Sequence, residues 1–255
     1  MNDPHVQAVY YSFKPRAGVL YDNPPAVAVS RPTFDGELRA TRFAARMTVH
    51  FPTIEEARVS VDAFLRAWEM TASLRSGYAE FRFEYDYCDI VDRDPPPPGT
   101  IQPYAVTGQG GVTISGTGPL SVTLPSYPPL PPVFLITPLV KMLWDRYMRY
   151  VAGNEPLFDM GYFCLTVLES YTGRRNQIAR RYKVELAILD KIGELSSSRG
   201  GPADARKMTK TQFTPATIGE QEWLKQAIRS LILQLGAVEA GDMNSRLVMS
   251  QLPKL

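Results

Sequence analysis

Histidine is the residue type that most often performs acid–base or metal chemistry near neutral pH, and this chain has two, His5 and His50. His5 lies in a terminal stretch that we expect to fray. His50 falls on the polar side of a predicted strand, where a solvated surface role is the preferred interpretation. A Ser-His-acid triad or a histidine metal site needs partners that no local spacing supplies. The sequence therefore predicts no catalytic residue, no metal site and no cofactor, and it argues against an enzyme.

Acidic residues at and beyond one predicted strand are the next candidates for chemistry: Glu84, Asp86, Asp89, Asp92 and Asp94. Hard cations such as Mg²⁺ prefer oxygen ligands that converge from several directions. One strand face and the loop after it seldom supply that convergence. Charged positions that protect a strand from edge pairing are therefore the preferred interpretation. A metal-dependent enzyme built on these acids stays as an alternative function.

Positive charge is concentrated in residues 174–210, where ten lysines and arginines accompany four acids. The segment carries a net charge of +6, the whole chain +2, and the remainder therefore −4. Its first half has the pattern of two helices with a turn near Lys183, and arginines beside such a pair would contact phosphates. We predict a site for a protein partner or nucleic acid here, formed by Arg174, Arg175, Arg180, Arg181, Lys183, Arg206 and Lys207. A solvated helix face, or a surface that meets the acidic remainder of the chain, is an equally open interpretation.

One strand is strongly aromatic on alternate positions: Phe81, Phe83, Tyr85 and Tyr87. Exposed aromatic residues on a sheet can stack nucleobases. An aromatic stripe with a strict period of two is more often buried, and the charges beside it are mostly acidic, which does not suit a phosphate backbone. The sequence therefore predicts that all four rings share one buried face.

The elements that position these residues change character in the middle of the chain. The first half has alternating patterns typical of strands at 6–13, 26–30, 38–51 and 80–92, and one helix between Thr53 and Gly77. Thr53 and Glu56 have the spacing of a capping box, and the charged side chains of this helix are predicted to face away from its apolar stripe: Glu55, Arg58, Asp62, Arg66 and Glu69. Residues 112–115 and 121–124 have the pattern of a hairpin. The glycines at 108, 110 and 111 are not followed by the residues of a phosphate-binding loop.

The second half has helical spacing almost throughout. Helices are predicted over residues 137–153 and 154–173, over 174–195 with a break near Lys183, and after Pro215. The sequence thus predicts an α+β fold in which an N-terminal antiparallel sheet with one covering helix is followed by an all-α helical bundle. The predicted boundaries are a β-rich domain at 1–125, a proline-rich linker at 126–136, the bundle at 137–240 and a tail at 241–255.

Composition excludes several classes of protein. The longest apolar stretch, residues 133–140, is too short to cross a bilayer, and the first residues lack the features of a signal peptide. The two cysteines, Cys88 and Cys164, lie in different halves, which excludes a disulfide framework or a cysteine metal cluster. We therefore expect a cytoplasmic protein with no membrane contact.

The helical half, residues 137–240, has Ala205-Arg206-Lys207 in a predicted connection and Glu222-Trp223-Leu224 at the start of a long final helix. In these features and in its helix order it resembles the HEPN superfamily of helical bundles. Catalytic members of that superfamily carry an arginine followed four to six residues later by a histidine. This chain has no histidine after His50, so the resemblance implies a non-catalytic member that binds RNA or a partner protein.

The expected function is that of a bacterial accessory or binding protein with a role in defence or stress. Its helical half would contact a protein partner or nucleic acid through the basic segment. A structural homo-oligomer, joined through tyrosine-rich apolar surfaces, is a third alternative beside the metal-dependent enzyme.

Overall fold

The computed structural model describes residues 2–95, 122–198 and 215–255, and the chain divides into two compact units. The first, called the sheet unit here, comprises Met1–Glu69 and Ala79–Leu130. The second, the helical unit, comprises Met70–Tyr78 and Pro131–Leu255. The boundary between them falls inside one long helix, so this helix contributes residues to both units.

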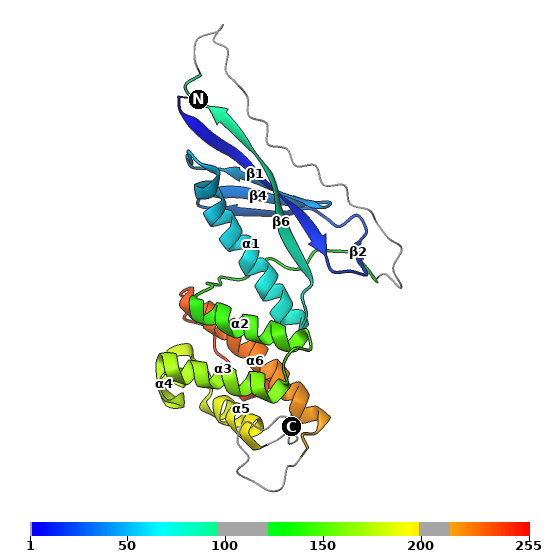
Figure 1. Ribbon diagram of the computed structural model, residues 1–255, viewed down its shortest axis with the longest axis vertical. Coiled ribbons are helices and arrows are strands. Elements are labelled where there is room, and N and C mark those ends of the chain that lie inside the picture. The colour runs from blue at the N-terminus through cyan, green and yellow to red at the C-terminus, as the bar shows by residue number, and fades with distance from the viewer. Residues whose placement is uncertain (1, 96–121, 199–214) are drawn as a thin grey trace. The chain divides into compact units, whose positions relative to one another are not determined.

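Strands dominate the sheet unit and helices the helical unit (Figure 1). The strands are β1 (Pro4–Pro15), β2 (Val19–Tyr21), β3 (Val27–Arg31), β4 (Phe34–Arg39), β5 (Arg42–Met47), β6 (Phe81–Asp92) and β7 (Val122–Leu124). The helices are α1 (Ile54–Ser76), α2 (Pro138–Val151), α3 (Leu157–Thr172), α4 (Arg175–Tyr182), α5 (Leu186–Ser198) and α6 (Ile218–Glu239), followed by a 3₁₀ turn (Met249–Gln251). The predicted α+β class, an antiparallel sheet with a covering helix followed by a helical bundle, is confirmed.

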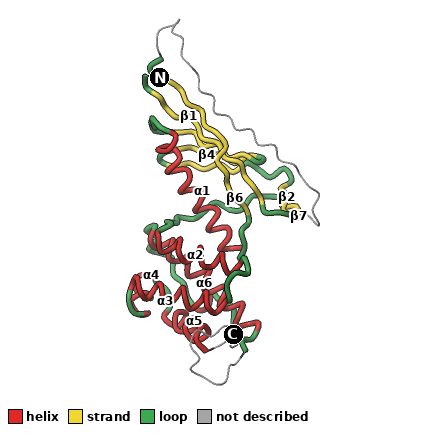
Figure 2. Tube along the Cα trace, viewed as in Figure 1, coloured by secondary structure: helices red, strands yellow, loops and turns green. Residues whose placement is uncertain are grey.

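The main sheet has the strand order β3-β4-β5-β1-β6, and all neighbouring strands in it are antiparallel. The helix α1 covers one face of this sheet (Figure 2). Trp68 of α1 packs against Phe43 and Phe83, with ring centroids 6.5 and 5.5 Å apart. Burying one side chain of this kind stabilises the fold by about 1.5–3 kcal/mol. These ring contacts therefore hold α1 against the sheet.

A bulge in β6 redirects its tyrosines. Tyr85 pairs with Tyr11 across the two strands, whereas Tyr87 pairs with Tyr10, so Asp86 is an extra residue on β6. Adjacent residues of a strand point to opposite faces, and an extra residue reverses the alternation beyond it. Tyr85 therefore shares the face of Tyr11, and Tyr87 shares the opposite face with Tyr10.

The prediction that four aromatic residues of this strand share one buried face is therefore wrong. Phe81 and Phe83 are buried in the core, and Tyr85 lies at its rim with 37% of its surface exposed. Tyr87 projects from the face that α1 does not cover. The aromatic residues do alternate along the sequence. The bulge, which depends on pairing with β1, moves Tyr87 to the opposite face of the sheet.

The ends of α1 are those that the sequence predicts. The Thr53 hydroxyl accepts a hydrogen bond of 3.3 Å from the Glu56 amide, which satisfies one of the free donors at the helix start. At the other end the Gly77 amide donates to the Ser73 carbonyl at 2.8 Å. Gly77 has a φ of +90°, a conformation that glycine adopts without strain and that ends the helix.

Two acids of α1 do not face away from the core, contrary to the prediction. Glu69 is only 9% exposed, and its carboxylate accepts the Phe83 amide at 2.5 Å. Asp62 accepts the Tyr11 hydroxyl at 2.5 Å. These positions border the apolar stripe of α1, where β1 and β6 bring a backbone amide and a hydroxyl within reach. The pattern of apolar residues along α1 cannot show that these donors lie nearby in the folded chain.

The predicted hairpin lies mainly outside the described residues, as do the glycines at 108, 110 and 111. Its described part, β7, pairs in parallel with β2 in a separate two-stranded sheet. In the proline-rich segment that follows, the Tyr127 hydroxyl donates to the Ala40 carbonyl, and the Trp68 indole donates to the Pro128 carbonyl at 3.2 Å. The start of this segment is thus part of the sheet unit.

In the helical unit, local signals define the helix boundaries. The Thr137 hydroxyl caps α2 by accepting the Val140 amide at 3.2 Å, and Pro138 occupies the first turn, where its missing N–H is not needed. Thr217 and Glu220 form a reciprocal capping box at the start of α6. Within the described ranges, no helix combines the length and apolar character needed to cross a membrane.

The final residues pack into the same unit. Leu247 and Leu252 are buried in the helical core, and Leu247 forms a β-bridge with Val184. The Gln234 side-chain amide of α6 donates to the Tyr182 carbonyl at 2.9 Å. The end of the chain thus covers the turn between α4 and α5.

Candidate nucleic-acid interface

The predicted break in the basic segment is present, and it separates α4 from α5. Lys183 follows α4 with a φ of +53°, in the left-handed region, and the Val184 amide bonds back to the Ala179 carbonyl. At the start of α4 the Gln177 side chain accepts the Arg174 amide at 2.8 Å. Ile178 is fully buried, so the inner side of this short helix is anchored in the bundle.

The outer side of α4 is exposed and carries only cationic and amide side chains. Arg174, Asn176, Gln177, Arg180 and Arg181 are all exposed, and α4 contains no acidic residue. Arginine and amide groups are hydrogen-bond donors that suit phosphate oxygens and base edges. We refer to these five residues as the α4 face.

Three of the predicted basic residues already have partners within the protein. Arg175 forms ion pairs with Glu169 at 3.0 Å and Asp190 at 3.1 Å. Partial burial by itself lowers the pKa of Arg175, but its hydrogen bonds to the two carboxylates outweigh burial, so the pKa is raised and the charge is secure. Arg175 therefore links α3, α4 and α5 and is not a candidate contact for a ligand.

Arg181 and Lys183 are partly engaged. Arg181 pairs with Glu239 of α6 at 2.9 Å, and the Tyr182 hydroxyl donates to the same carboxylate at 3.0 Å. The Lys183 ammonium donates to the Met243 carbonyl. Arg181 remains more than half exposed and can still reach a ligand.

Arg174 and Arg180 make no ion pair with any residue that the structure describes. Arg206 and Lys207 lie outside the described residues. Of the seven predicted residues, the structure thus brings Arg174, Arg180 and Arg181 together on the exposed α4 face and assigns Arg175 and Lys183 to internal contacts. The sequence could not show this division, because the partners Glu239 and Met243 lie about sixty residues further along the chain.

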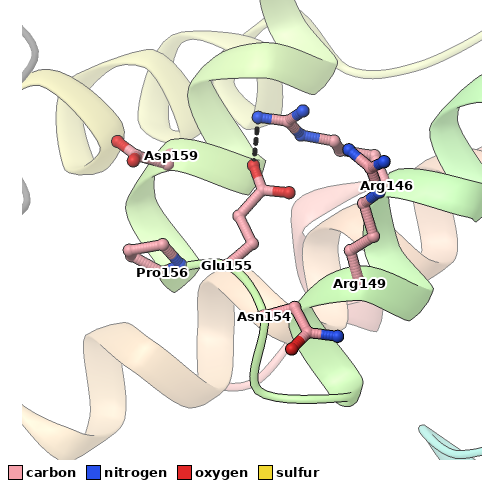
Figure 3. A pocket seen from close by; sticks show the side chains of 6 residues that line it. All are labelled: Arg146, Arg149, Asn154, Glu155, Pro156 and Asp159. Atoms are coloured by element: carbon pink, nitrogen blue, oxygen red, sulfur yellow. Dashed lines mark ion pairs between the residues drawn. The ribbon is translucent and has the colours of Figure 1, made fainter.

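A second polar site, which the sequence analysis missed, lies between α2 and α3 in a pocket of about 450 Å³ (Figure 3). Arg146 and Glu155 form an ion pair there, and their side chains are only 19% and 7% exposed. The Arg146 guanidinium also lies over the Phe163 ring, 4.2 Å from its centroid. Close by in the core, burial raises the pKa of the Cys164 thiol to about 12, so it is not a nucleophile at neutral pH.

The sheet unit holds a third polar site, a pocket of about 320 Å³ beside α1. Asp62 accepts Tyr11 at 2.5 Å and Arg58 at 3.2 Å, and the Arg58 guanidinium lies 4.3 Å from the centre of the Tyr85 ring. Burial and the bond to Asp62 raise the pKa of Tyr11 above its ordinary value. Both Asp62 oxygens are already bonded to side chains of the protein, so this network stabilises the contact between α1 and the sheet.

The histidines lie at one end of the sheet, and His5 is not in a frayed terminus as predicted. It belongs to β1, which begins at Pro4 because its first residues pair with the end of β6. The imidazole rings of His5 and His50 are 5.3 Å apart, and the nearest oxygen of Asp3 is 3.5 Å from His50 Nε2. Among the described residues, no hydrogen bond joins either ring to a serine or cysteine that could act as a nucleophile.

The acids of β6 are spread along the strand, and three of the four are bonded to groups within the protein. Glu84 pairs with Arg82 at 2.6 Å, Asp89 accepts the Tyr10 hydroxyl at 2.9 Å, and Asp92 accepts the amides of residues 2 and 3. In the part of the chain that the structure describes, no group of three or more histidine, cysteine or acidic residues could hold a metal ion.

We compared the chain with protein-family models, with curated proteins and with solved structures, and none of the three comparisons found a match. The α4 face is therefore argued from its own residues.

Proposed function

We propose that this protein is a non-catalytic nucleic-acid-binding protein and that the α4 face contacts the phosphate backbone. The observation that carries the proposal is the exposed side of α4, a helix that contains no acidic residue, where Arg174 and Arg180 have no ion pair among the described residues. An exposed arginine without a carboxylate partner is free to exchange its counterion for a phosphate, and counterion release favours binding.

The composition of the α4 face supports nucleic acid over an acidic protein as the partner. Asn176 and Gln177 stand beside the arginines. Amide groups bind phosphates, sugars and base edges in nucleic-acid complexes, whereas they add no charge complementarity toward carboxylates. Arginine also binds phosphate with two parallel hydrogen bonds.

The proposed nucleic-acid contact also includes residues from the rest of the basic segment. Arg206 and Lys207 belong to the stretch with a net charge of +6, and we include them as phosphate contacts. The resemblance to HEPN bundles supports RNA as the nucleic acid and a non-catalytic role, because the helical half has no histidine.

The test is the salt dependence of RNA binding by the full chain. We expect a labelled 20-nucleotide RNA to bind at 50 mM KCl, with an affinity that falls steeply by 200 mM. Replacing Arg174 and Arg180 by glutamine should weaken binding and reduce the slope of log affinity against log salt by about 1.4, from about 0.7 for each contact to a single strand.

A matched control replaces Arg149 and Arg246, two exposed arginines outside the α4 face, by glutamine. This variant loses the same net charge and should keep the wild-type slope. Equal weakening in both double variants would show a general charge effect and overturn the α4 assignment. Binding to polyglutamate in place of RNA would support an acidic protein partner.

A further inference from the structure

The face of the main sheet opposite α1 carries a stacked tyrosine pair. Tyr10 and Tyr87 lie with ring centroids 4.4 Å apart and ring planes 20° apart. The Tyr10 hydroxyl donates to Asp89 at 2.9 Å, and Arg42 donates to the Tyr87 hydroxyl at 3.4 Å. Both rings are thus anchored before any ligand arrives, and a rigid ring loses little entropy on binding.

The strand register defines what lies beside this pair. Ala28, Glu37, Ala44, Tyr10 and Tyr87 follow one another in a single row across the five strands. Tyr87 stacks on one side of the Tyr10 ring, and the register places Ala44 on the neighbouring strand at the other side. Neighbouring strands are about 4.8 Å apart, so we infer that the short Ala44 side chain leaves room for one flat ring beside Tyr10, a place that we call the shelf.

Two arginines border this shelf. Arg42 and Arg46 lie two residues before and after Ala44 on β5, on the same face of the sheet, and both are exposed. The Arg42 guanidinium lies 6.0 Å from the centre of the Tyr10 ring. Arg46 makes no ion pair within the described ranges of the chain.

Two carboxylates of this face are neutralised by ion pairs, Glu37 with Arg39 at 2.7 Å and Glu84 with Arg82 at 2.6 Å. Asp35, which is opposite Arg46 in the strand register, accepts the Ser30 hydroxyl, and Asp89 accepts that of Tyr10, so both of these carboxylates keep their negative charge. Arg42 and Arg46 form no ion pair with a described carboxylate, and they are the positive charges next to the shelf.

We propose that this shelf binds one nucleotide of a single-stranded nucleic acid, with the base stacked on Tyr10 above Ala44 and the flanking phosphates on Arg42 and Arg46. The inference rests on the proposed function in that the ligand is nucleic acid, but the surface is a separate one in the sheet unit. Single strands fit and duplexes do not, because a base must be unpaired to insert its face beside a tyrosine.

The experiment compares the full chain with an Ala44→Leu variant, which fills the shelf beside Tyr10 and leaves both tyrosines unchanged. The control is Ala28→Leu, an exposed alanine in the same row but away from Tyr10. The probes are a labelled 20-nucleotide oligouridylate and a blunt-ended, fully paired RNA duplex. We expect Ala44→Leu to weaken oligouridylate binding about tenfold, from the loss of one stacked base, and to leave duplex binding unchanged.

Equal affinity of the Ala44→Leu and Ala28→Leu variants for oligouridylate would overturn the inference. If Ala44→Leu does not fold, Arg46→Gln replaces it as the test variant, with Arg31→Gln as its control, because the Arg31 guanidinium lies over Phe64 of α1. The Arg46 variant should reduce the salt slope by about 0.7, and an unchanged slope would overturn the inference equally. The double variant of Arg174 and Arg180 distinguishes the two proposals. If only this double variant weakens binding, the sheet inference fails and the α4 proposal stands. If only Ala44→Leu weakens binding, the α4 proposal fails and the sheet inference stands.

Discussion

Tyr87 stacks on Tyr10 at a centroid distance of 4.4 Å, on the face of the sheet opposite to the buried Phe83. The two aromatic residues of β6 are only four positions apart, and in an unbroken strand they would share a face. The bulge at Asp86 places them on opposite faces, so that Phe83 lies in the core and Tyr87 lies on the face that α1 does not cover. One extra residue in β6 therefore produces the surface that we propose as a base-stacking site.

The Tyr10–Tyr87 stack should contribute to the stability of the sheet unit. Replacing Tyr87 by leucine removes the stacked ring and its contact with Arg42, and we expect a loss of about 1 kcal/mol. Hydrogen exchange of the β1 and β6 amides measures this loss locally. Tyr162→Leu, an exposed tyrosine of α3, is the control and should leave those amides unchanged. Equal protection in both variants would contradict the stabilising role of the stack.

Removal of the Tyr11 hydroxyl should destabilise the contact between α1 and the sheet. Tyr11 is 2% exposed and its hydroxyl bonds to Asp62, so Tyr11→Phe leaves one carboxylate oxygen without that partner. We expect a cost of about 1–3 kcal/mol, measured by exchange of the α1 amides. Asp62→Ala should cost a similar amount, and the double variant should cost less than the sum, because both changes break the same bond. Additive losses would show that the two side chains act independently.

Tyr11 also makes the stability of the sheet unit depend on pH in the alkaline range. Burial and Asp62 raise the pKa of Tyr11 in the folded state above its unfolded value of 10.0. The folded state thus binds this proton more tightly, so the contribution is complete below pH 10 and is lost as pH rises further. Ultraviolet titration should show tyrosines that stay protonated after the exposed tyrosines ionise, because the pKa values of Tyr147 and Tyr182 are raised as well. The Tyr11→Phe variant should have one fewer tyrosine in this late transition.

His5 should give the opposite dependence near neutral pH. Burial, then the nearby charges of His50 and Arg93, lower the pKa of His5 below its ordinary value of 6.5. The unfolded state therefore binds this proton more tightly, and stability that is present above pH 6.5 is lost as pH falls through the lower folded pKa. His50→Gln removes one positive neighbour and should raise the pKa of His5, as measured by proton NMR of its imidazole. An unchanged or lower value in this variant would contradict the assignment.

Removing one partner of the Arg146–Glu155 ion pair should destabilise the helical unit, whereas replacing both partners by apolar residues should change its stability little. Glu155→Gln leaves the largely buried Arg146 guanidinium without its counter-charge, and we expect a loss of about 3 kcal/mol in the helical unit. Replacing both residues together, as Arg146→Met with Glu155→Leu, should restore most of the stability, because apolar side chains of similar volume need no counter-charge. Hydrogen exchange of the α2 and α3 amides, measured as the temperature is raised, compares the stability of the single and double variants. A double variant as unstable as the single one would show that the pair has another role.

Local signals in the sequence were sufficient for the fold class and for most helix ends. Thr53 and Gly77 at the ends of α1, Thr137 with Pro138 at the start of α2, and the break at Lys183 all depend on residues within a few positions of one another. Such capping and turn preferences act over one helical turn, so the chain displays them before it folds. The concentration of positive charge after Gly173 is likewise a property of the sequence alone.

Only the tertiary structure decided which charged side chains and aromatic rings remain exposed to a ligand. Arg181 meets Glu239 from 58 positions away, and the bulge in β6 exists only because β1 pairs beside it. The period of two therefore indicated a single buried aromatic face, whereas the folded chain places Tyr87 on the opposite one. The physical reason is that ion pairs, bulges and burial depend on distances in space between segments far apart in sequence, whereas helix caps and net charge depend on neighbours along the chain.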